Sequence, residues 1–229
     1  MMEQRSIEWF RERLGKITGS MVGQLMKKGR GNSPFSQTAM KYIYQIAAER
    51  TMNSELVRND EQFAAYLEQV DVTTKAMRWG TEQEMFARNL LSEVTMEYIE
   101  EVGSVSHPSI PHFASSPDGV IKDEDGKIRC CVEIKCPNQN TFMMYVNEVH
   151  SAKELLDVNS DYYYQCMAHM MCTGAKNCIF MVYNPYQQIP YHTVEISEDK
   201  EAFEEVAAAI EKANKLITDI TTRQDELHW

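Results

Sequence analysis

Long apolar runs, C-x-x-C cysteine pairs and internal repeats are all missing from this 229-residue chain. No stretch of about 18 apolar residues occurs, which argues against a membrane-spanning helix, and residues 1–5 do not begin a signal-peptide-like segment. The six cysteines lack the spacing of a zinc knuckle or an iron–sulfur cluster and are expected to be reduced, mostly buried thiols. We therefore predict a cytoplasmic protein with no membrane partner.

An overall excess of positive charge is also missing, because the net charge is −11. The charge is unevenly distributed along the chain. Residues 1–50 contain nine Lys and Arg against four Asp and Glu, a net of +5, whereas residues 51–229 contain fourteen against thirty, a net of −16. This asymmetry indicates that the opening residues hold a polyanion in one restricted place. Chance clustering on a solvated helix is the alternative.

The order of the predicted elements indicates a single mixed α/β domain over residues 1–229. Helices are expected at 6–14, 20–28, 33–50, 73–91, 138–148, 160–173 and 199–220, and strands at 95–103, 111–121, 128–135, 177–183 and 190–196. Residues 51–72 lack clear periodicity and are expected to be a surface excursion. The interpretation is a basic helical segment over residues 1–50, followed by a core over 73–220 in which helices flank a mixed central sheet.

Two short motifs flank a polar, Gly-containing stretch that is typical of a hairpin turn: Ser-Pro-Asp-Gly at 116–119 and Val-Glu-Ile-Lys-Cys-Pro at 132–137. Because side chains alternate along a strand, Glu133 and Lys135 share one face and Ile134 points into the core. A turn near residues 124–125 places Asp118 within about one pair of Glu133. Adjacent carboxylates repel unless a cation lies between them, which predicts a divalent cation, with Mg²⁺ first, and Lys135 at its edge. A solvated hairpin is the alternative.

One acidic side chain on the predicted helix 73–91 is expected to face inward. At about 3.6 residues per turn, Glu84 shares a row with Gly80, Ala87 and Leu91, whereas Glu82 falls on another row and is expected to be solvated. An inward carboxylate needs a partner, since an unpaired buried charge is very costly. A metal ion or an arginine would satisfy it, and an ordinary buried salt bridge is the alternative.

A phosphate-binding pattern precedes this region. A helix beginning near Ser20 offers free N–H groups and its dipole to a phosphate, and Arg13 can fork onto the same phosphate from the preceding helix. Plain N-capping by Ser20 and a surface role for Arg13 are the alternatives. The loop 27–32 contains three basic residues that suit a DNA backbone or, alternatively, a mobile surface loop: Lys27, Lys28 and Arg30.

The Tyr- and Met-rich helix predicted at 160–173 is expected to be mostly core. Gln165, a polar residue, is the exception. A satisfied core glutamine is the alternative. His169, one turn further on, is expected to be structural, and contact with the site is the alternative.

Pro117-Asp118 together with Glu133-Ile134-Lys135 resembles the PD-(D/E)xK nuclease signature. The fuller strings Ser-Pro-Asp-Gly and Glu-Ile-Lys-Cys-Pro resemble the phage λ exonuclease and YqaJ-type viral recombinase family in particular. The resemblance extends to Trp-Gly at 79–80 followed by Glu84, to Tyr-x-x-Gln at 162–165, and to an R-x-G-x-I-T-x-S-like segment with Arg13, Thr18 and Ser20. It implies a restriction-endonuclease-like core and a Mg²⁺-dependent 5′-to-3′ exodeoxyribonuclease, with Mn²⁺ as a substitute, that acts on ends of double-stranded DNA in phage or prophage recombination.

The resemblance also implies a role for each matching residue. The predicted cation ligands are Asp118, Glu133, the Ile134 carbonyl and Glu84. The predicted catalytic helpers are Lys135, which orients and activates the attacking water, and Gln165. The predicted DNA contacts are Arg13, Thr18 and Ser20, with the basic loop beside them. A ring-shaped homotrimer and a single-strand annealing partner are implied as well. The alternatives are a structure- or sequence-specific endonuclease of the same core and a non-catalytic DNA-binding module.

Overall fold

The computed structural model describes residues 4–31 and 33–226. Within this part of the chain the helices are α1 (Ile7–Arg13), α2 (Gly19–Leu25), α3 (Gln37–Arg50), α4 (Ser54–Arg58), α5 (Asp60–Val70), α6 (Lys75–Thr95), α7 (Gln139–Glu148), α8 (Ala152–Val158), α9 (Ser160–Thr173) and α10 (Lys200–Glu226). The strands are β1 (Ile17–Thr18), β2 (Val105–Ser106), β3 (Phe113–Ser115), β4 (Gly119–Lys122), β5 (Ile128–Lys135), β6 (Asn177–Tyr183) and β7 (Tyr191–Ser197). No helix in these ranges combines the length and the apolar character that a bilayer span requires.

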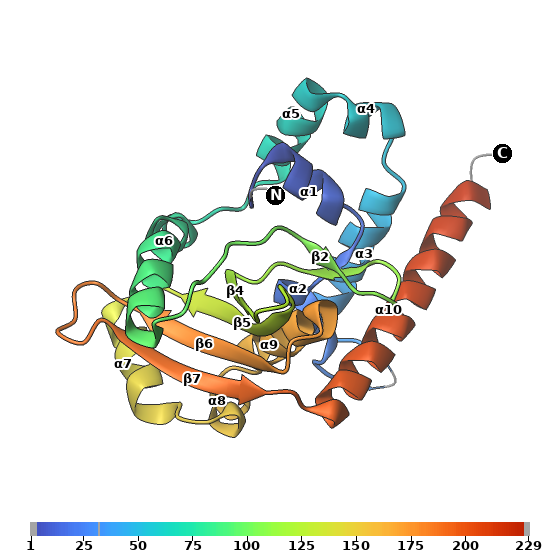
Figure 1. The fold of residues 1–229 in the computed structure, drawn as a ribbon. Helices are drawn as coiled ribbons and strands as arrows, with labels where there is room; N and C mark the ends of the chain where they lie inside the picture. The colour runs from blue at the N-terminus through green and yellow to red at the C-terminus, as the bar shows by residue number, and fades with distance from the viewer. Residues whose placement is uncertain (1–3, 32, 227–229) are drawn as a thin grey trace.

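The larger sheet is mixed and has the strand order β4-β5-β6-β7 (Figure 1). β5 pairs antiparallel with β4 and parallel with β6, and β7 pairs antiparallel with β6. The parallel pair requires a crossover, which α7, α8 and α9 supply. α9 packs on β5 and β6 from one face, and Ala87 and Leu91 of α6 pack with Val132 and Ile134 on the other. The predicted mixed sheet with flanking helices is confirmed.

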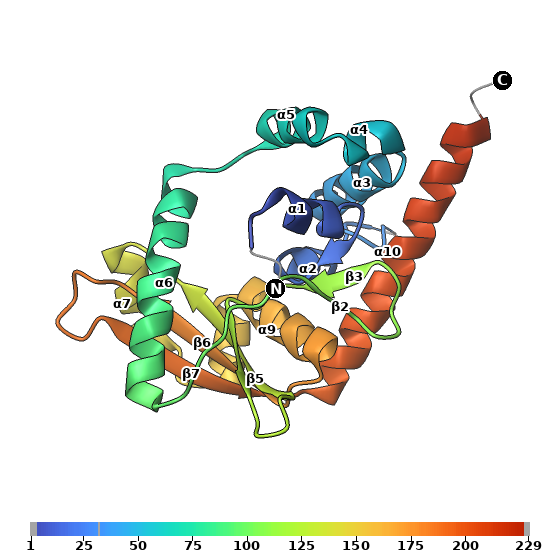
Figure 2. The same ribbon diagram turned by 45° about the horizontal axis from the view of Figure 1, so that its top comes forward.

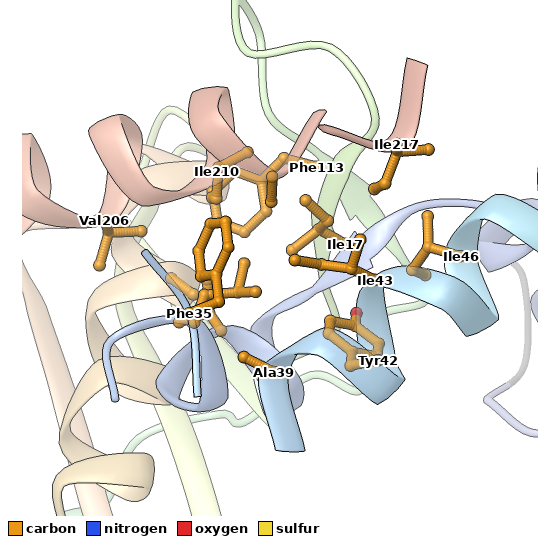
Figure 3. Packing of buried hydrophobic residues seen from close by; sticks show 14 of the residues in the cluster. Ile17, Phe35, Ala39, Tyr42, Ile43, Ile46, Phe113, Val206, Ile210 and Ile217 are labelled. Carbon is orange, nitrogen blue, oxygen red and sulfur yellow. The ribbon is translucent and has the colours of Figure 1, made fainter. Parts of the chain in front are cut away.

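The opening residues share a hydrophobic core with the last long helix. A second sheet of order β1-β3-β2 brings Ile17 beside Phe113. Figure 3 shows these two side chains and Ile43 of α3 packed with Ile210 and Ile217 of α10. The segment that the sequence predicts to bind phosphate, at the start of α2, is therefore supported by this core.

Several predicted element boundaries are wrong. The strand at 95–103 does not form, because α6 continues to Thr95 and ends at Met96 in a left-handed conformation with φ 55°. In that range the structure has a single bridge, from Glu100 to Val120. Ser36, and not Ser33, caps α3, and α2 ends at Leu25.

The surface excursion predicted at 51–72 contains two helices. Asn53 and Asn59 accept backbone N–H groups at the starts of α4 and α5, so short-range capping stabilises helices with little periodicity. Figure 2 shows α4 and α5 on the opposite side of the molecule from β7. The helix α8 was not predicted at all.

The predicted strand at 111–121 divides into β3 and β4, which belong to different sheets. The break falls at residues 116–118, so this short segment joins the small sheet, with its packed opening residues, to the large sheet. The division brings the Ser-Pro-Asp part of the motif to the junction between the two sheets.

Replacing Gly19 by alanine is expected to destabilise the protein by about 1–3 kcal/mol. A Cβ at Gly19 would overlap the Ser115 hydroxyl and lie 3.0 Å from Ser115 Cβ. Gly80, inside α6, is a matched control because an added Cβ there meets nothing within 4 Å, and Gly80→Ala is expected to stabilise the protein by about 0.5–1 kcal/mol. Urea unfolding of both variants measures the difference. Equal stability of the two variants would show that Gly19 is not constrained by this contact.

Candidate active site

The hairpin of β4 and β5 brings Asp118 and Glu133 together as predicted. Gly119 pairs with Val132, which places Asp118 opposite Glu133. The Asp118 N–H donates to the Val132 carbonyl at 3.0 Å, and the Ile134 N–H donates to Asp118 Oδ2 at 2.7 Å. These two bonds fix the Asp118 carboxylate at the edge of β5.

Glu133 is almost completely buried, at 1% exposed. Its Oε2 lies 2.5 Å from His169 Nε2, and its Oε1 forms an ion pair with Lys135 Nζ. Among the described residues, this Oε1 has no well-oriented hydrogen bond, so the ion pair leaves the atom incompletely satisfied. Burial alone would raise the pKa of Glu133, but Lys135 and His169 outweigh it and lower the pKa below its usual value.

Asp118 behaves in the opposite way. Burial, followed by the negative charge of Glu133, raises the pKa of Asp118 well above its usual value. Two buried carboxylates thus compete for the positive charge of Lys135, and their mutual repulsion opposes ionisation of Asp118. A divalent cation is the partner that would allow both to ionise, because it supplies two positive charges to oxygen ligands.

Lys135 lies on the same face as Glu133, and Ile134 is buried on the other face, as the alternation predicts. The ammonium is 4.7 Å from the centre of the Tyr162 ring. Burial lowers the pKa of Lys135, but the nearby carboxylates of Glu133 and Asp118 raise it far more. Lys135 is therefore a permanent cation at neutral pH.

Glu84 faces inward from α6, with 20% of its side chain exposed, and Glu82 is exposed. Of the two partners that the sequence left open, the structure has the arginine: Arg5 donates to both Glu84 oxygens, at 2.8 and 2.9 Å. Burial raises the pKa of Glu84, and Arg5 opposes this shift. Within residues 4–31 and 33–226 no three His, Cys, Asp or Glu side chains converge on a metal position. Asp118 and Glu133 are thus adjacent, whereas Glu84 is held by Arg5.

Arg13 reaches the junction segment from α1. Its guanidinium stacks 4.0 Å from the Trp9 ring centre and donates to Ser116 Oγ at 2.9 Å, and Trp9 Nε1 donates to the same oxygen at 3.2 Å. Loss of hydration lowers the pKa of Arg13 to about 10, still far above neutrality. In the described part of the chain no carboxylate pairs with Arg13. A cation without a salt-bridge partner among the described residues thus contacts Ser116, two residues before Asp118, and the sequence predicts no role for Ser116.

The other predicted DNA contacts differ in their exposure and in their partners. α2 begins at Gly19, so the N-cap position belongs to Thr18, which is buried and makes no side-chain cap, and not to Ser20, which is exposed. The two hydroxyl oxygens are 3.4 Å apart. Lys27 is paired with Asp161 of α9 at 2.7 Å. Lys28 and Arg30 are exposed, and position 32 of this loop lies outside the described residues.

α9 contributes Gln165 and His169 to this region. Gln165 is buried, at 8% exposed, and no hydrogen bond among the described residues holds its amide, which differs from a satisfied core glutamine. His169, expected to be structural, contacts Glu133 directly. The i, i+4 spacing from Gln165 was the available signal, since it places both side chains on one face of the helix.

A family model and solved structures of known proteins both match this chain, and they agree with each other. Residues 8–176 match the model of a family described as a YqaJ-like viral recombinase domain. The crystal structure of an alkaline exonuclease (LHK-Exo) from Laribacter hongkongensis is 27% identical, with a TM-score of 0.69, over 97% of this chain and 100% of that one. The same enzyme in complex with dAMP has a TM-score of 0.70 at the same identity and coverage.

A more distant structure has the same fold. A phage-related exonuclease from Haemophilus somnus is 12% identical, with a TM-score of 0.65 over 91% of this chain and 96% of that one. At this identity the likeness supports the fold alone. No curated protein sequence matches the chain.

Proposed function

The chain belongs to the family of YqaJ-like viral recombinase domains and is a nuclease, and from this premise we propose that it degrades duplex DNA from its 5′ ends with the help of a divalent cation. The observation that carries the proposal is the buried pair of Asp118 and Glu133 with opposite pKa shifts, next to the Lys135 cation. Arg13 and Ser116 lie beside this pair in a position suited to a DNA phosphate.

The donor set fits Mg²⁺. Asp118 and Glu133 supply carboxylate oxygens, and Glu133 Oε1, which pairs with Lys135 without a well-oriented hydrogen bond, is a buried oxygen that can also bind a cation. The Ile134 carbonyl and Glu84 are proposed to complete the set, with Glu84 exchanging Arg5 for the cation. Mn²⁺ accepts the same oxygen ligands and is expected to substitute. When bound, the cation would stabilise negative charge that develops on the phosphate.

The chain's own residues divide the remaining work. Because Lys135 stays protonated, it orients the attacking water and stabilises charge on a phosphate oxygen, and it does not remove a proton. The Gln165 amide can hold the same water. Attack on phosphorus with departure of the 3′ oxygen leaves a 5′-phosphate and a 3′-hydroxyl. Arg13, Ser116 and Ser20 would hold the terminal phosphate, with Thr18, Lys28 and Arg30 near the DNA backbone.

Oligomeric state and partner proteins belong to the same proposal. The ring-shaped homotrimer and the annealing partner that the family resemblance implies remain predictions. Lys27 is the weakest of the proposed DNA contacts, because it would first have to release Asp161. Light scattering on the purified protein measures whether it forms a trimer.

Digestion of end-labelled linear duplexes, beside a closed circle, tests the proposed function. We expect Mg²⁺-dependent release of 5′ label, faster from 5′-phosphorylated than from 5′-hydroxyl ends, and no cutting of the circle. Arg13→Gln is expected to remove the preference for phosphorylated ends, because it deletes the unpaired cation at Ser116. Cleavage of the closed circle would instead indicate an endonuclease, and release of 3′ label first would reverse the proposed polarity.

A further inference from the structure

His169 is the one buried histidine that contacts a proposed cation ligand in the part of the chain that the structure describes. It lies on α9 with 1% of its surface exposed. Its Nε2 lies 2.5 Å from Glu133 Oε2, and its Nδ1 lies 2.7 Å from Ser115 Oγ. Because both ring nitrogens are engaged, the imidazole can neither rotate nor exchange its partners without losing a hydrogen bond.

The direction of the two hydrogen bonds follows from the chemistry of the partners. A neutral imidazole has one donor and one acceptor nitrogen, and an ionised carboxylate only accepts. The Nε2–H group therefore donates to Glu133, and Nδ1 accepts the Ser115 hydroxyl proton. Glu133 thus selects this tautomer of the neutral ring, and the Ser115 hydroxyl fits it because a hydroxyl can donate as well as accept.

The consequence falls on the Glu133 carboxylate. With Oε2 held by His169, the plane of the carboxylate is set and Oε1 is turned toward Lys135 and away from other donors. We propose that His169, oriented by Ser115, is a positioning residue that presents Glu133 Oε1 to the divalent cation. The inference rests on the proposed function, because the cation belongs to it.

Ser115 also connects this set of residues to the DNA-binding side of the molecule. A side chain at Gly19 would overlap the Ser115 hydroxyl, and Ala168, the neighbour of His169, lies 3.3 Å from the same Cβ position. Gly19 stands between Thr18 and Ser20, two of the proposed DNA contacts. The hydroxyl of Ser115 therefore fills the space between the phosphate-binding segment and His169.

A calorimetric titration of the metal-free protein with Mn²⁺ tests the proposal without measuring DNA cleavage. His169→Leu removes the donor and is expected to weaken Mn²⁺ binding by about 10–100-fold, the usual cost of losing a hydrogen bond that orients a ligand. His169→Gln is expected to restore most of the affinity, since its amide nitrogen can donate to Glu133 Oε2. His192→Leu is a matched control. His192 lies on β7, two strands from β5, and its Nε2 is 2.6 Å from the Val149 carbonyl oxygen. The His192→Leu substitution should therefore leave Mn²⁺ binding unchanged.

The outcomes separate this inference from the proposed function. Tight Mn²⁺ binding by the wild type and equally tight binding by folded His169→Leu would overturn the positioning role alone. A folded His169→Gln that binds as weakly as His169→Leu would do the same, because the donor would then be irrelevant. If the wild type bound no Mn²⁺, both proposals would fall.

A second variant covers the case in which His169→Leu does not fold. Ser115→Ala keeps the imidazole but removes the group that orients it, and a several-fold loss of Mn²⁺ affinity is expected. Unchanged affinity in a folded Ser115→Ala protein would also overturn the proposal. Thermal unfolding of each variant before titration shows which proteins are folded.

Discussion

Replacing Lys135 by alanine is expected to slow DNA cleavage by about 10²–10³-fold, the usual effect of removing one electrostatic group that stabilises a transition state. Duplex binding should stay within a few-fold of the wild type, because Arg13 and the α2 segment are left in place. The reason is the charge of Lys135: its raised pKa keeps it cationic beside two buried carboxylates, where it can stabilise charge on the phosphate. Single-turnover cleavage with saturating enzyme, together with fluorescence anisotropy for binding, measures the two effects separately.

Lys176 provides the control for this experiment. It also forms an ion pair with a glutamate, Glu198, but 71% of its side chain is exposed. Because exposed ion pairs contribute little, Lys176→Ala should leave cleavage and binding unchanged. A fully active Lys135→Ala protein would show that the ammonium has no part in the reaction.

Replacing Asp118 by asparagine is expected to abolish metal-dependent cleavage and, in the presence of a chelator, to stabilise the protein. The folded-state pKa of Asp118 is raised, so its contribution to stability is complete below the unfolded-state pKa of about 3.9 and is lost as the pH rises through the folded-state pKa. At pH 8 the metal-free wild type therefore carries a cost that asparagine removes. Asparagine also keeps an oxygen to accept the Ile134 N–H.

Thermal unfolding across pH 5.5–8, with chelator and then with Mg²⁺, measures this prediction. A gain of about 1 kcal/mol would raise the unfolding midpoint of Asp118→Asn by about 2–4 °C over the wild type at pH 8 in chelator, and the gain should shrink toward low pH. Mg²⁺ should raise the midpoint of the wild type and not that of Asp118→Asn, since a ligand stabilises the state that binds it. Asp157, exposed on α8, is the control carboxylate, and Asp157→Asn should follow the wild type. An Asp118→Asn protein that still gained stability from Mg²⁺ would remove Asp118 from the ligand set.

The pair of Asp118 and Glu133 shows which features of the site local sequence patterns can predict. Strand alternation placed Glu133 and Lys135 on one face, and the turn length placed Asp118 opposite Glu133; both predictions are confirmed. Helical periodicity likewise turned Glu84 inward. These features depend on residues a few positions apart, so backbone geometry alone specifies them.

The partners of these residues came from elsewhere in the chain. His169 lies 36 residues from Glu133, and they meet only because the crossover packs α9 on β5. Ser116 meets Arg13 because one predicted strand divides between two sheets, and Arg5 reaches Glu84 across 79 residues. The sequence by itself determined which side chains share a face. The tertiary structure decided what faces them, because docking of α9 and of the opening residues depends on burial of distant apolar surfaces, which no local repeat encodes.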